Sequence, residues 1–199
     1  MAEPASPRQF ATKGKVKRDL FLGRFQPFHN GHAAIVKSMK SNPVVVIVKG
    51  SKSSTDKDKN PFNEEYQMEM ISAVFPNLEV SISPNGFLPG ILGFFRKKGE
   101  EITRIYCGKD RIEGYKKAID NANTKMDDQY RYDVEFIETP RIARATEVRD
   151  AIKKNDEALF KKLVPRQLWG EFDKMKQIIL DESKLLSFEE WLIENNYYL

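Results

Sequence analysis

Short apolar runs alternate with helix-like segments along the first 140 residues, and this alternation limits the possible folds more than any other feature. The clearest run, Val44–Val48, contains only β-branched residues and is typical of a strand that is buried on both faces. Strands are expected at 19–23, 44–48, 78–82, 104–107 and 132–137, and helices at 31–40, 63–75, 88–97 and 110–121. This order predicts an α/β fold, a Rossmann-like parallel sheet with helices on both faces, followed by a helical C-terminus from residue 146.

Length and composition favour a single domain. The chain has 199 residues, of which 40% are hydrophobic and 31% are charged. Its longest apolar run is too short to cross a bilayer, and the polar N-terminus lacks the apolar segment of a signal peptide. The single cysteine, Cys107, allows no intrachain disulfide and no zinc site built from cysteines. We therefore expect a cytoplasmic protein with no membrane partner.

The net charge of +4 is concentrated at the N-terminus. Residues 1–18 carry five Lys or Arg residues and one Glu, so they account for all of it. The neutral remainder does not favour nucleic-acid binding. We expect residues 1–18 to form a flexible basic leader and residues 19–199 to form one domain, in which 165–199 is a C-terminal helical extension. The apolar C-terminus is expected to pack on its own domain, and packing on a second copy in a homo-oligomer is the alternative.

The loops that follow the predicted strands should share one edge of the sheet. In parallel α/β sheets, ligands bind outside the carboxyl ends of the strands. The segments expected at that edge are 23–32, 49–62, 107–111 and 138–149.

The only two histidines, His29 and His32, lie three residues apart where a predicted strand runs into a predicted helix. At this spacing both rings can point the same way, and Gly31 between them lets a ligand approach the backbone. The N-terminus of a helix adds free N–H groups and a positive dipole end, which favour a phosphate. The pattern indicates an anion site with two imidazoles. A pair of structural histidines in a turn is the alternative.

The residues around these histidines favour the anion site. The segment GRFQPFHNGH, from Gly23 to His32, resembles the HxGH signature of the nucleotidylyltransferase superfamily, and its first part is most similar to archaeal-type nicotinamide mononucleotide adenylyltransferases. The resemblance implies that His32 contacts the α-phosphate, His29 the β- and γ-phosphates, and Arg24 the phosphates at the mouth of the loop. It also implies nucleotide contacts from Gly23, Phe25 and Gly31.

A second segment, RATEVR at 144–149, resembles the superfamily's Ile-Ser-Ser-Thr-x-x-Arg motif and also precedes a helical stretch. Thr146 is suited to cap the helix or to donate its hydroxyl to phosphate, and Arg149 is suited to bind two phosphate oxygens. The resemblance implies that both contact the triphosphate. Arg144 and Ala145 replace the two serines of the motif, so hydroxyl contacts are missing. An ordinary capped helix with a basic first turn is the alternative.

A third segment, CGKDR at 107–111, follows a predicted strand and resembles the segment with which these enzymes hold adenosine. There Gly108 would let the base or ribose approach, Lys109 or Arg111 would add charge, and Asp110 would accept a ribose hydroxyl. Capping of the next helix is a sufficient alternative explanation for Asp110.

The acceptor side departs from the archaeal-type pattern. Its Asn-Pro-Phe anchor is present at 60–62, but Tyr66 and Gln67 stand where those enzymes have a Glu-Arg pair whose arginine faces the substrate. Phe87, after the next strand, would stack on a ring or pack on the core. A pattern found near the end of some virus-encoded members, which suggests a viral origin, is matched at Asp156, Phe160, Lys161 and Pro165.

The resemblance covers roughly residues 19–162. It implies an enzyme that transfers AMP from ATP to nicotinamide mononucleotide and gives NAD. Mg²⁺ would be held mainly by the phosphates, since no carboxylate cluster appears and no metal ligand is assigned. Lys49 and Lys52 would add phosphate contacts from a mobile lid. Transfer of an adenylyl or cytidylyl group to another phosphorylated acceptor is one alternative. A catalytically silent nucleotide-binding or structural protein is another.

Overall fold

A computed structural model describes residues 16–49, 56–140 and 142–180. Within these residues, five strands form one parallel sheet in the order β3-β2-β1-β4-β5. The strands are β1 (Val16–Gly23), β2 (Val44–Val48), β3 (Glu79–Ser83), β4 (Glu100–Cys107) and β5 (Glu135–Glu138). The central strand β1 pairs with β2 on one side and with β4 on the other.

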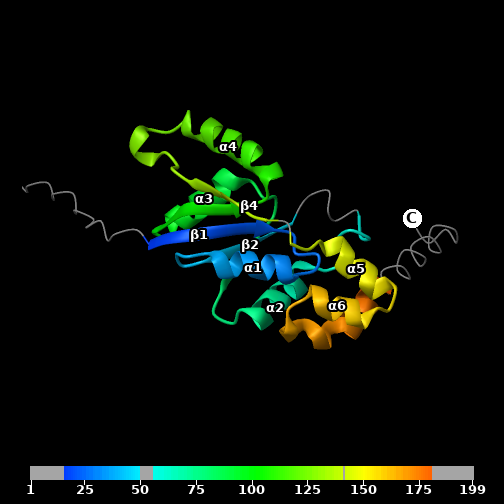
Figure 1. The fold of residues 1–199 in the computed structure, drawn as a ribbon. Coiled ribbons are helices and arrows are strands. Elements are labelled where there is room, and N and C mark those ends of the chain that lie inside the picture. The colour runs from blue at the N-terminus through cyan, green and yellow to red at the C-terminus, as the bar shows by residue number, and fades with distance from the viewer. Residues whose placement is uncertain (1–15, 50–55, 141, 181–199) are drawn as a thin grey trace, which may run out of the picture.

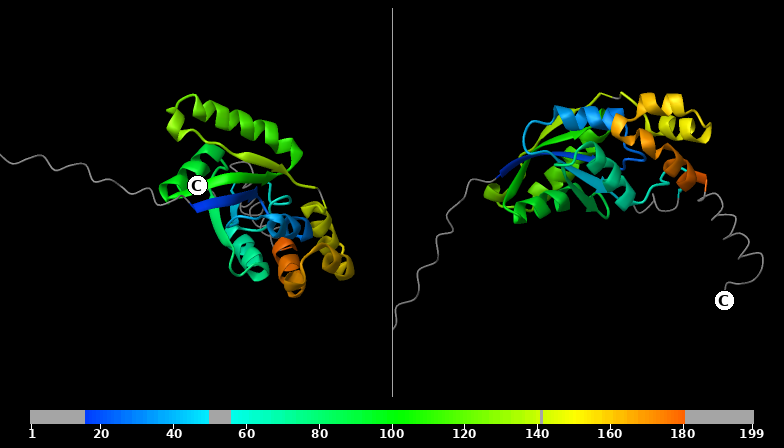
Figure 2. Two further views of the ribbon diagram at one scale, coloured as in Figure 1. Left: turned by 60° about the vertical axis from the view of Figure 1, so that its left-hand side comes forward. Right: turned by 90° about the horizontal axis from the view of Figure 1, so that it is seen from below.

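Helices cover both faces of the sheet (Figures 1 and 2). They are α1 (Asn30–Ser38), α2 (Glu64–Val74), α3 (Leu88–Lys97), α4 (Lys109–Asn123), α5 (Ala145–Lys153) and α6 (Glu157–Leu163), with short 3-10 helices η1 (Asp128–Tyr130) and η2 (Arg166–Glu171). Residues 172–180 continue as helix. Helices α3 and α4 lie on one face, and α1, α2, α5 and α6 lie on the other. This confirms the predicted Rossmann-like α/β fold.

Alternating residues of β1 pack into two hydrophobic cores, one on each face of the sheet. Leu20 and Leu22 pack with α3 on one face, whereas Phe21 packs with α1 and α2 on the other. Strand β2 divides in the same way, because both of its faces are covered. A strand buried on both faces needs a continuous apolar run, which explains the sequence of Val44–Val48.

Strand β1 begins before its expected start, so Val16–Arg18 belong to the sheet and not to the leader. Strand β4 begins at Glu100, earlier than expected, because it pairs with this extension. The Arg18 guanidinium forms ion pairs with Glu79 and Glu100 at 2.6 and 2.8 Å, which balance its charge inside the fold. The rest of the expected leader, residues 1–15, lies outside the described residues, as does 181–199 of the expected C-terminal extension.

Strand β5 begins at Glu135 and not at Tyr132, where the sequence had placed its start. The backbone N–H and C=O of Tyr132 bond instead to the side chain of Asn123 at the end of α4, at 2.8 and 2.9 Å. Pairing with β4 therefore starts only where Glu135 lies opposite Arg104.

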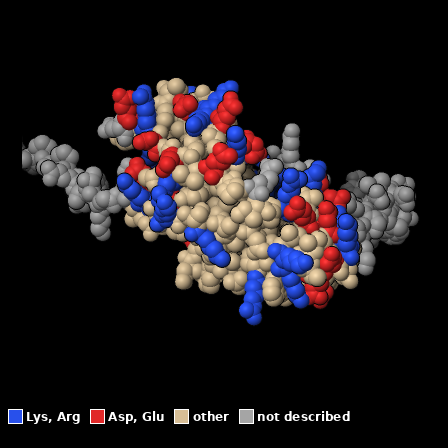
Figure 3. Space-filling model, in the orientation of Figure 1, with Lys and Arg blue, Asp and Glu red and all other residues tan. Residues whose placement is uncertain are grey.

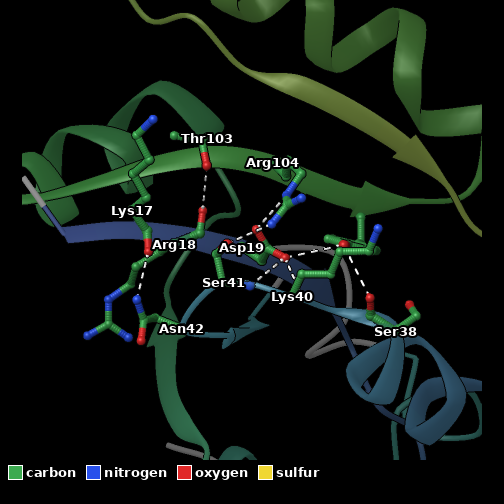
Figure 4. A network of polar contacts seen from close by, with 10 residues as sticks. Lys17, Arg18, Asp19, Ser38, Lys40, Ser41, Asn42, Thr103 and Arg104 are labelled. Carbon is green, nitrogen blue, oxygen red and sulfur yellow. Dashed lines mark hydrogen bonds and ion pairs between the residues drawn. The ribbon is translucent and has the colours of Figure 1, made fainter.

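A buried carboxylate ties β1 to its neighbours away from the carboxyl edge of the sheet (Figure 4). Asp19 is fully buried and accepts hydrogen bonds from the backbone N–H groups of Lys40 and Ser41 and from the side chains of Arg104 and Tyr106. Burial raises the pKa of Asp19, but these hydrogen bonds and the charge of Arg104 outweigh it, so the pKa lies below its usual value. The carboxylate is ionised and structural.

The described surface carries both signs of charge. On the face shown in Figure 3, basic and acidic side chains are interspersed and form no extended basic patch. Among the described residues, no helix is long and apolar enough to cross a membrane.

Candidate active site

A cavity of about 480 Å³ opens at the carboxyl ends of the strands. All four segments that were expected at this edge contribute to its lining, which confirms that prediction. The contributing residues include Arg24, Phe25, His29 and His32, then Lys59 and Asn60, then Gly108, Asp110 and Arg111, and finally Thr139, Arg144, Thr146 and Arg149.

His29 caps helix α1 with its own side chain. Its Nδ1 accepts hydrogen bonds from the backbone N–H groups of Gly31 and His32, at 3.1 and 3.4 Å. An Nδ1 that accepts two hydrogen bonds carries no proton, so the neutral ring has its hydrogen on Nε2. This leaves Nε2–H as the donor of His29 for a ligand.

Glycine is required between the two histidines. A Cβ on Gly31 would lie 3.0 Å from Cε1 of His29 and 3.3 Å from the backbone nitrogen of Ala143. The missing side chain thus lets the His29 ring fold over the start of α1 and lets the 142–144 segment approach it.

His32 lies in an aromatic cluster. Its ring stacks on His29 with centroids 3.7 Å apart, and it contacts the rings of Phe21, Phe25 and Phe28 at 5.0 to 5.9 Å. Its Nδ1 is buried and has no hydrogen-bond partner among the described residues. Since the residue also lines the cavity, the ring meets the cavity through its Nε2 side.

Both histidines are neutral at pH 7. Burial lowers the pKa of His29 to about 4. Burial also lowers the pKa of His32 well below its usual value, and the neighbouring His29 lowers it further. The two rings therefore carry no charge at this pH, and the positive charge of the cavity comes from its Arg and Lys side chains.

Phe25 supports the His32 ring from a strained backbone. Its φ angle is 44°, in the left-handed region that disfavours bulky residues, and its side chain is almost fully buried. The Phe25 ring meets that of His32 edge-on, at 77°. A Cβ on Gly23 would lie 2.6 Å from the Phe25 ring, and Gly23 is not among the cavity residues. Gly23 thus lies against the Phe25 ring and outside the lining of this cavity.

Arg149 and Thr146 bring helix α5 to the cavity. Nη1 of Arg149 donates to the backbone oxygen of Gln26 at 2.6 Å, and its Nη2 donates to Oγ1 of Thr146 at 3.3 Å. Thr146 does not cap α5, because the helix begins at Ala145 and its N-cap is Arg144. The carboxylate of Glu147 accepts from the backbone N–H of Arg144, so the Thr146 hydroxyl is not needed as a cap.

The adenosine segment is only partly as expected. Gly108 is the N-cap of α4, and both it and Asp110 line the cavity. Lys109 is exposed and is not among the cavity residues, whereas Arg111 is. The expected positive charge thus comes from Arg111.

Lys59 and Asn60, the first residue of the Asn-Pro-Phe anchor, also line the cavity, although neither was predicted as a site residue. Oδ1 of Asn60 accepts from Nη1 of Arg24 at 3.5 Å. Lys49, an expected phosphate contact, forms an ion pair with Glu64 at 3.4 Å and lines a neighbouring cavity of about 190 Å³. Lys52 lies outside the described residues.

The two unusual acceptor-side residues have structural partners. Tyr66 donates to Glu171 at 2.7 Å, and Gln67 is buried and donates to the backbone oxygen of Phe62 at 2.8 Å. Oε1 of Gln67 is buried and has no partner within the described part of the chain. Phe87 is 59% exposed and lines a separate apolar groove between β3 and α3.

A resident metal would find few protein ligands at this site. The described ranges contain no group of three or more His, Cys, Asp or Glu side chains suited to hold an ion. Asp110 is the one carboxylate in the lining of the cavity. This donor set fits a cation that is held mainly by phosphate oxygens.

Comparisons with known proteins show what the chain is similar to. Residues 20–89 match the family described as cytidylyltransferase-like. A nicotinamide-nucleotide adenylyltransferase of Thermococcus kodakarensis is 40% identical over 67 residues, which cover 33% of this chain and only 36% of that protein. One from Sulfurisphaera tokodaii is 26% identical over 162 residues, which cover 80% of this chain and 92% of that protein.

A solved structure has a similar fold. It is a bifunctional NMN adenylyltransferase/ADP ribose pyrophosphatase from Francisella tularensis, complexed with AMP and a manganese ion. Its TM-score is 0.54 at 19% identity, over 90% of this chain and 56% of that one. The sequence matches support the resemblance to nucleotidylyltransferases, and this solved structure shares the fold.

Proposed function

We propose that this member of the nucleotidylyltransferase superfamily is a nicotinamide-nucleotide adenylyltransferase, which transfers AMP from ATP to nicotinamide mononucleotide and releases pyrophosphate. One observation carries the proposal: the two stacked histidines at the start of α1 share a cavity with Thr146 and Arg149 at the start of α5. Two helix N-termini, two imidazoles and several cations around one cavity suit a polyphosphate. The names of the sequence relatives support the choice of acceptor.

The reaction needs no nucleophile from the protein. A phosphate oxygen of nicotinamide mononucleotide attacks the α-phosphorus of ATP, the bond from that phosphorus to the oxygen bridging to the β-phosphorus breaks, and pyrophosphate leaves. The protein has to hold two anions that repel each other and to stabilise the charge that grows on the leaving group. This task requires donors and cations in fixed positions, which the cavity provides.

We assign the donors as the family resemblance implies, to residues that line the cavity. His32 would contact the α-phosphate, and Nε2–H of His29 would donate to the β- or γ-phosphate. Arg149, held by Gln26 and Thr146, would bind the triphosphate, and Arg24 would bind it at the mouth of the cavity. The adenosine would be contacted by residues of the 23–31 loop and of the start of α4, namely Phe25, Gly31, Gly108, Asp110 and Arg111.

Mg²⁺ fits this arrangement as a companion of the substrate. When bound, it supplies neutralising charge to the phosphates. The Lys and Arg side chains of the cavity would share that task. Asp110, which lines the cavity, would contact a water or a ribose hydroxyl.

Transfer to a different phosphorylated acceptor is the second candidate, and one observation favours it. Gln67 occupies the position of the arginine that faces substrate in the archaeal-type enzymes, and here its amide is engaged by Phe62. The acceptor side therefore offers less positive charge at that position.

An endpoint assay tests the proposal. The protein is incubated with Mg²⁺, ATP and nicotinamide mononucleotide, and NAD and pyrophosphate are measured by chromatography with mass detection. Parallel reactions contain CTP or nicotinic acid mononucleotide. We expect NAD and pyrophosphate in equal amounts. Absence of NAD, together with thermal stabilisation by ATP, would transfer support to the second candidate. Absence of both would overturn nucleotidyl transfer and favour a silent structural protein.

A further inference from the structure

We propose that Gln26 is a positioning residue, which fixes the Lys59–Asn60 wall of the cavity relative to Arg149. This inference rests on the proposed function, because it concerns the same site. Gln26 lies in the loop between β1 and α1, three residues before His29. Its side chain is buried, with an exposed fraction of 8%. The motif resemblance gave it no role.

The side-chain amide of Gln26 makes two hydrogen bonds to the backbone of Phe62, as the peptide group of a neighbouring β-strand would. Its Nε2 donates to the backbone oxygen of Phe62 at 2.7 Å, and its Oε1 accepts from the backbone N–H of the same residue at 2.9 Å. Both polar groups of one peptide position are thereby satisfied by a single amide. The orientation of that amide is unambiguous, because a backbone oxygen can only accept and an N–H can only donate.

The backbone of Gln26 holds the opposite wall. Its carbonyl oxygen accepts from Nη1 of Arg149 at 2.6 Å. One residue thus joins the 60–62 segment to helix α5, although these parts of the chain are more than 80 residues apart in sequence. Phe62 is 2% exposed, so water cannot easily replace the Gln26 amide there.

This link determines where two cavity residues lie. Lys59 and Asn60 precede Phe62 in the chain and line the main cavity, and Asn60 also contacts Arg24. Without the amide, the N–H of Phe62 loses its partner, whereas its oxygen keeps the hydrogen bond from Gln67. The segment would then settle in a different position, and its lysine would no longer be held at a fixed distance from Arg149.

The first test compares Gln26→Leu with Asn123→Leu. Each leucine removes a side-chain amide that bonds to the backbone N–H and C=O of one residue, which is Phe62 at the cavity for Gln26 and Tyr132 away from the cavity for Asn123. We expect kcat/KM for ATP to fall about 10- to 100-fold for Gln26→Leu, as small misplacements do in enzyme sites. Asn123→Leu should lose thermal stability with less than about a threefold change in kcat/KM. Equal activity losses in the two variants would show a general stability effect and overturn the proposal.

The second test is a double-mutant cycle with Lys59→Ala. If Gln26 acts by placing Lys59, then Gln26→Leu should cost much less in the Lys59→Ala background than in the wild type. Multiplicative effects would mean that Gln26 does not act through Lys59 and would contradict the proposal.

A second variant, Gln26→Glu, tests the same role if Gln26→Leu does not fold. A protonated glutamic acid offers one donor and one acceptor, as glutamine does, but an ionised one cannot donate to the oxygen of Phe62. Activity of Gln26→Glu should therefore fall relative to the wild type as the pH rises. A constant ratio between pH 5.5 and 8.5 would count against the role of Gln26.

A failure of the proposed function is distinguishable from a failure of this inference. If the wild type makes no NAD, the dissociation constant for ATP, measured by calorimetry, replaces kcat/KM in each comparison. Gln26→Leu should then bind ATP about tenfold more weakly than Asn123→Leu does. Equal affinities would overturn the role of Gln26.

Discussion

The imidazole rings of His29 and His32 stack with their centroids 3.7 Å apart and their planes 17° from parallel. Nδ1 of His29 is fully engaged by the first backbone N–H groups of α1, and Nδ1 of His32 is buried. Each ring is therefore left with its other nitrogen for a ligand. The pair offers polar ring nitrogens without introducing a buried charge.

His29 caps α1, and the proposed function also gives it a binding role, so two substitutions are chosen to separate the two roles. Asparagine is a good N-cap, so His29→Asn should keep most of the stability, whereas His29→Ala should lose about 1 kcal/mol more. Both variants lack the Nε2 donor and should lose nucleotide affinity to a similar extent. Urea unfolding and calorimetry with ATP measure the two effects. If His29→Asn retained full affinity, the assignment of Nε2 would be wrong.

His32→Phe keeps the aromatic packing and removes the unpartnered Nδ1. Because phenylalanine matches the surrounding rings of Phe21, Phe25 and Phe28, we expect the free energy of unfolding to stay within about 1 kcal/mol of the wild type or to increase. Turnover should fall at least about 100-fold, because a donor to the α-phosphate is lost. Near-normal turnover in a folded His32→Phe protein would remove His32 from the reaction.

The neutral histidines predict a loss of stability in mild acid. The pKa of His29 is about 4 in the folded chain and 6.5 in the unfolded chain, so the unfolded chain binds more protons between these values. Stability is then full above pH 6.5 and falls as the pH decreases toward 4. His29 alone should account for about 2 kcal/mol between pH 7 and pH 5.

The matched control for this pH dependence is His29→Asn, which cannot titrate. The difference in unfolding free energy between wild type and variant should change with pH, and a constant difference would contradict the assigned burial. A bound triphosphate favours protonated imidazole, so ATP binding at pH 6 should also take up protons. The binding enthalpy would then vary with the ionisation enthalpy of the buffer.

Asp19 belongs to a buried polar network that lies outside the cavity, so its substitution should affect stability and not turnover. Asp19→Ala leaves Arg104 without its buried partner, so we expect a loss of about 3 kcal/mol in unfolding free energy. Asp128→Ala breaks an exposed pair with Arg131 and should cost less than about 1 kcal/mol. The kcat of the folded Asp19→Ala protein should stay within about twofold of the wild type. A large fall in kcat at full folding would show that this network reaches the cavity.

The elements predicted with correct bounds are those whose own residues carry a clear pattern. Val44–Val48 was predicted with correct bounds, since only a strand covered on both faces suits such a run, and α3 was also placed correctly at Leu88–Lys97. The start of β1 was missed because Val16–Arg18 looks like an exposed basic tail. Its ion pairs with Glu79 and Glu100 come from residues distant in sequence.

The site residues were predicted where they belong to one short motif and missed where two segments combine. His29 and His32 follow from the motif alone. Lys109 and Arg111 differ by two residues, so they point about 200° apart around α4, and the sequence does not specify which one faces the cavity. The bond between Gln26 and Phe62 joins positions 36 residues apart, and neither residue type signals it.

The position of β1 between β2 and β4 has a consequence for how the protein matures. Residues 20–89 contain the two histidines, whereas Gly108 and Arg111 follow β4, which pairs on the other side of β1, and Thr146 and Arg149 lie on α5. A chain that has emerged only as far as β3 therefore contains the histidines but lacks these four residues. Under the proposed function, nucleotide affinity would report completed assembly, and ATP would selectively stabilise chains in which both parts of the site are in place.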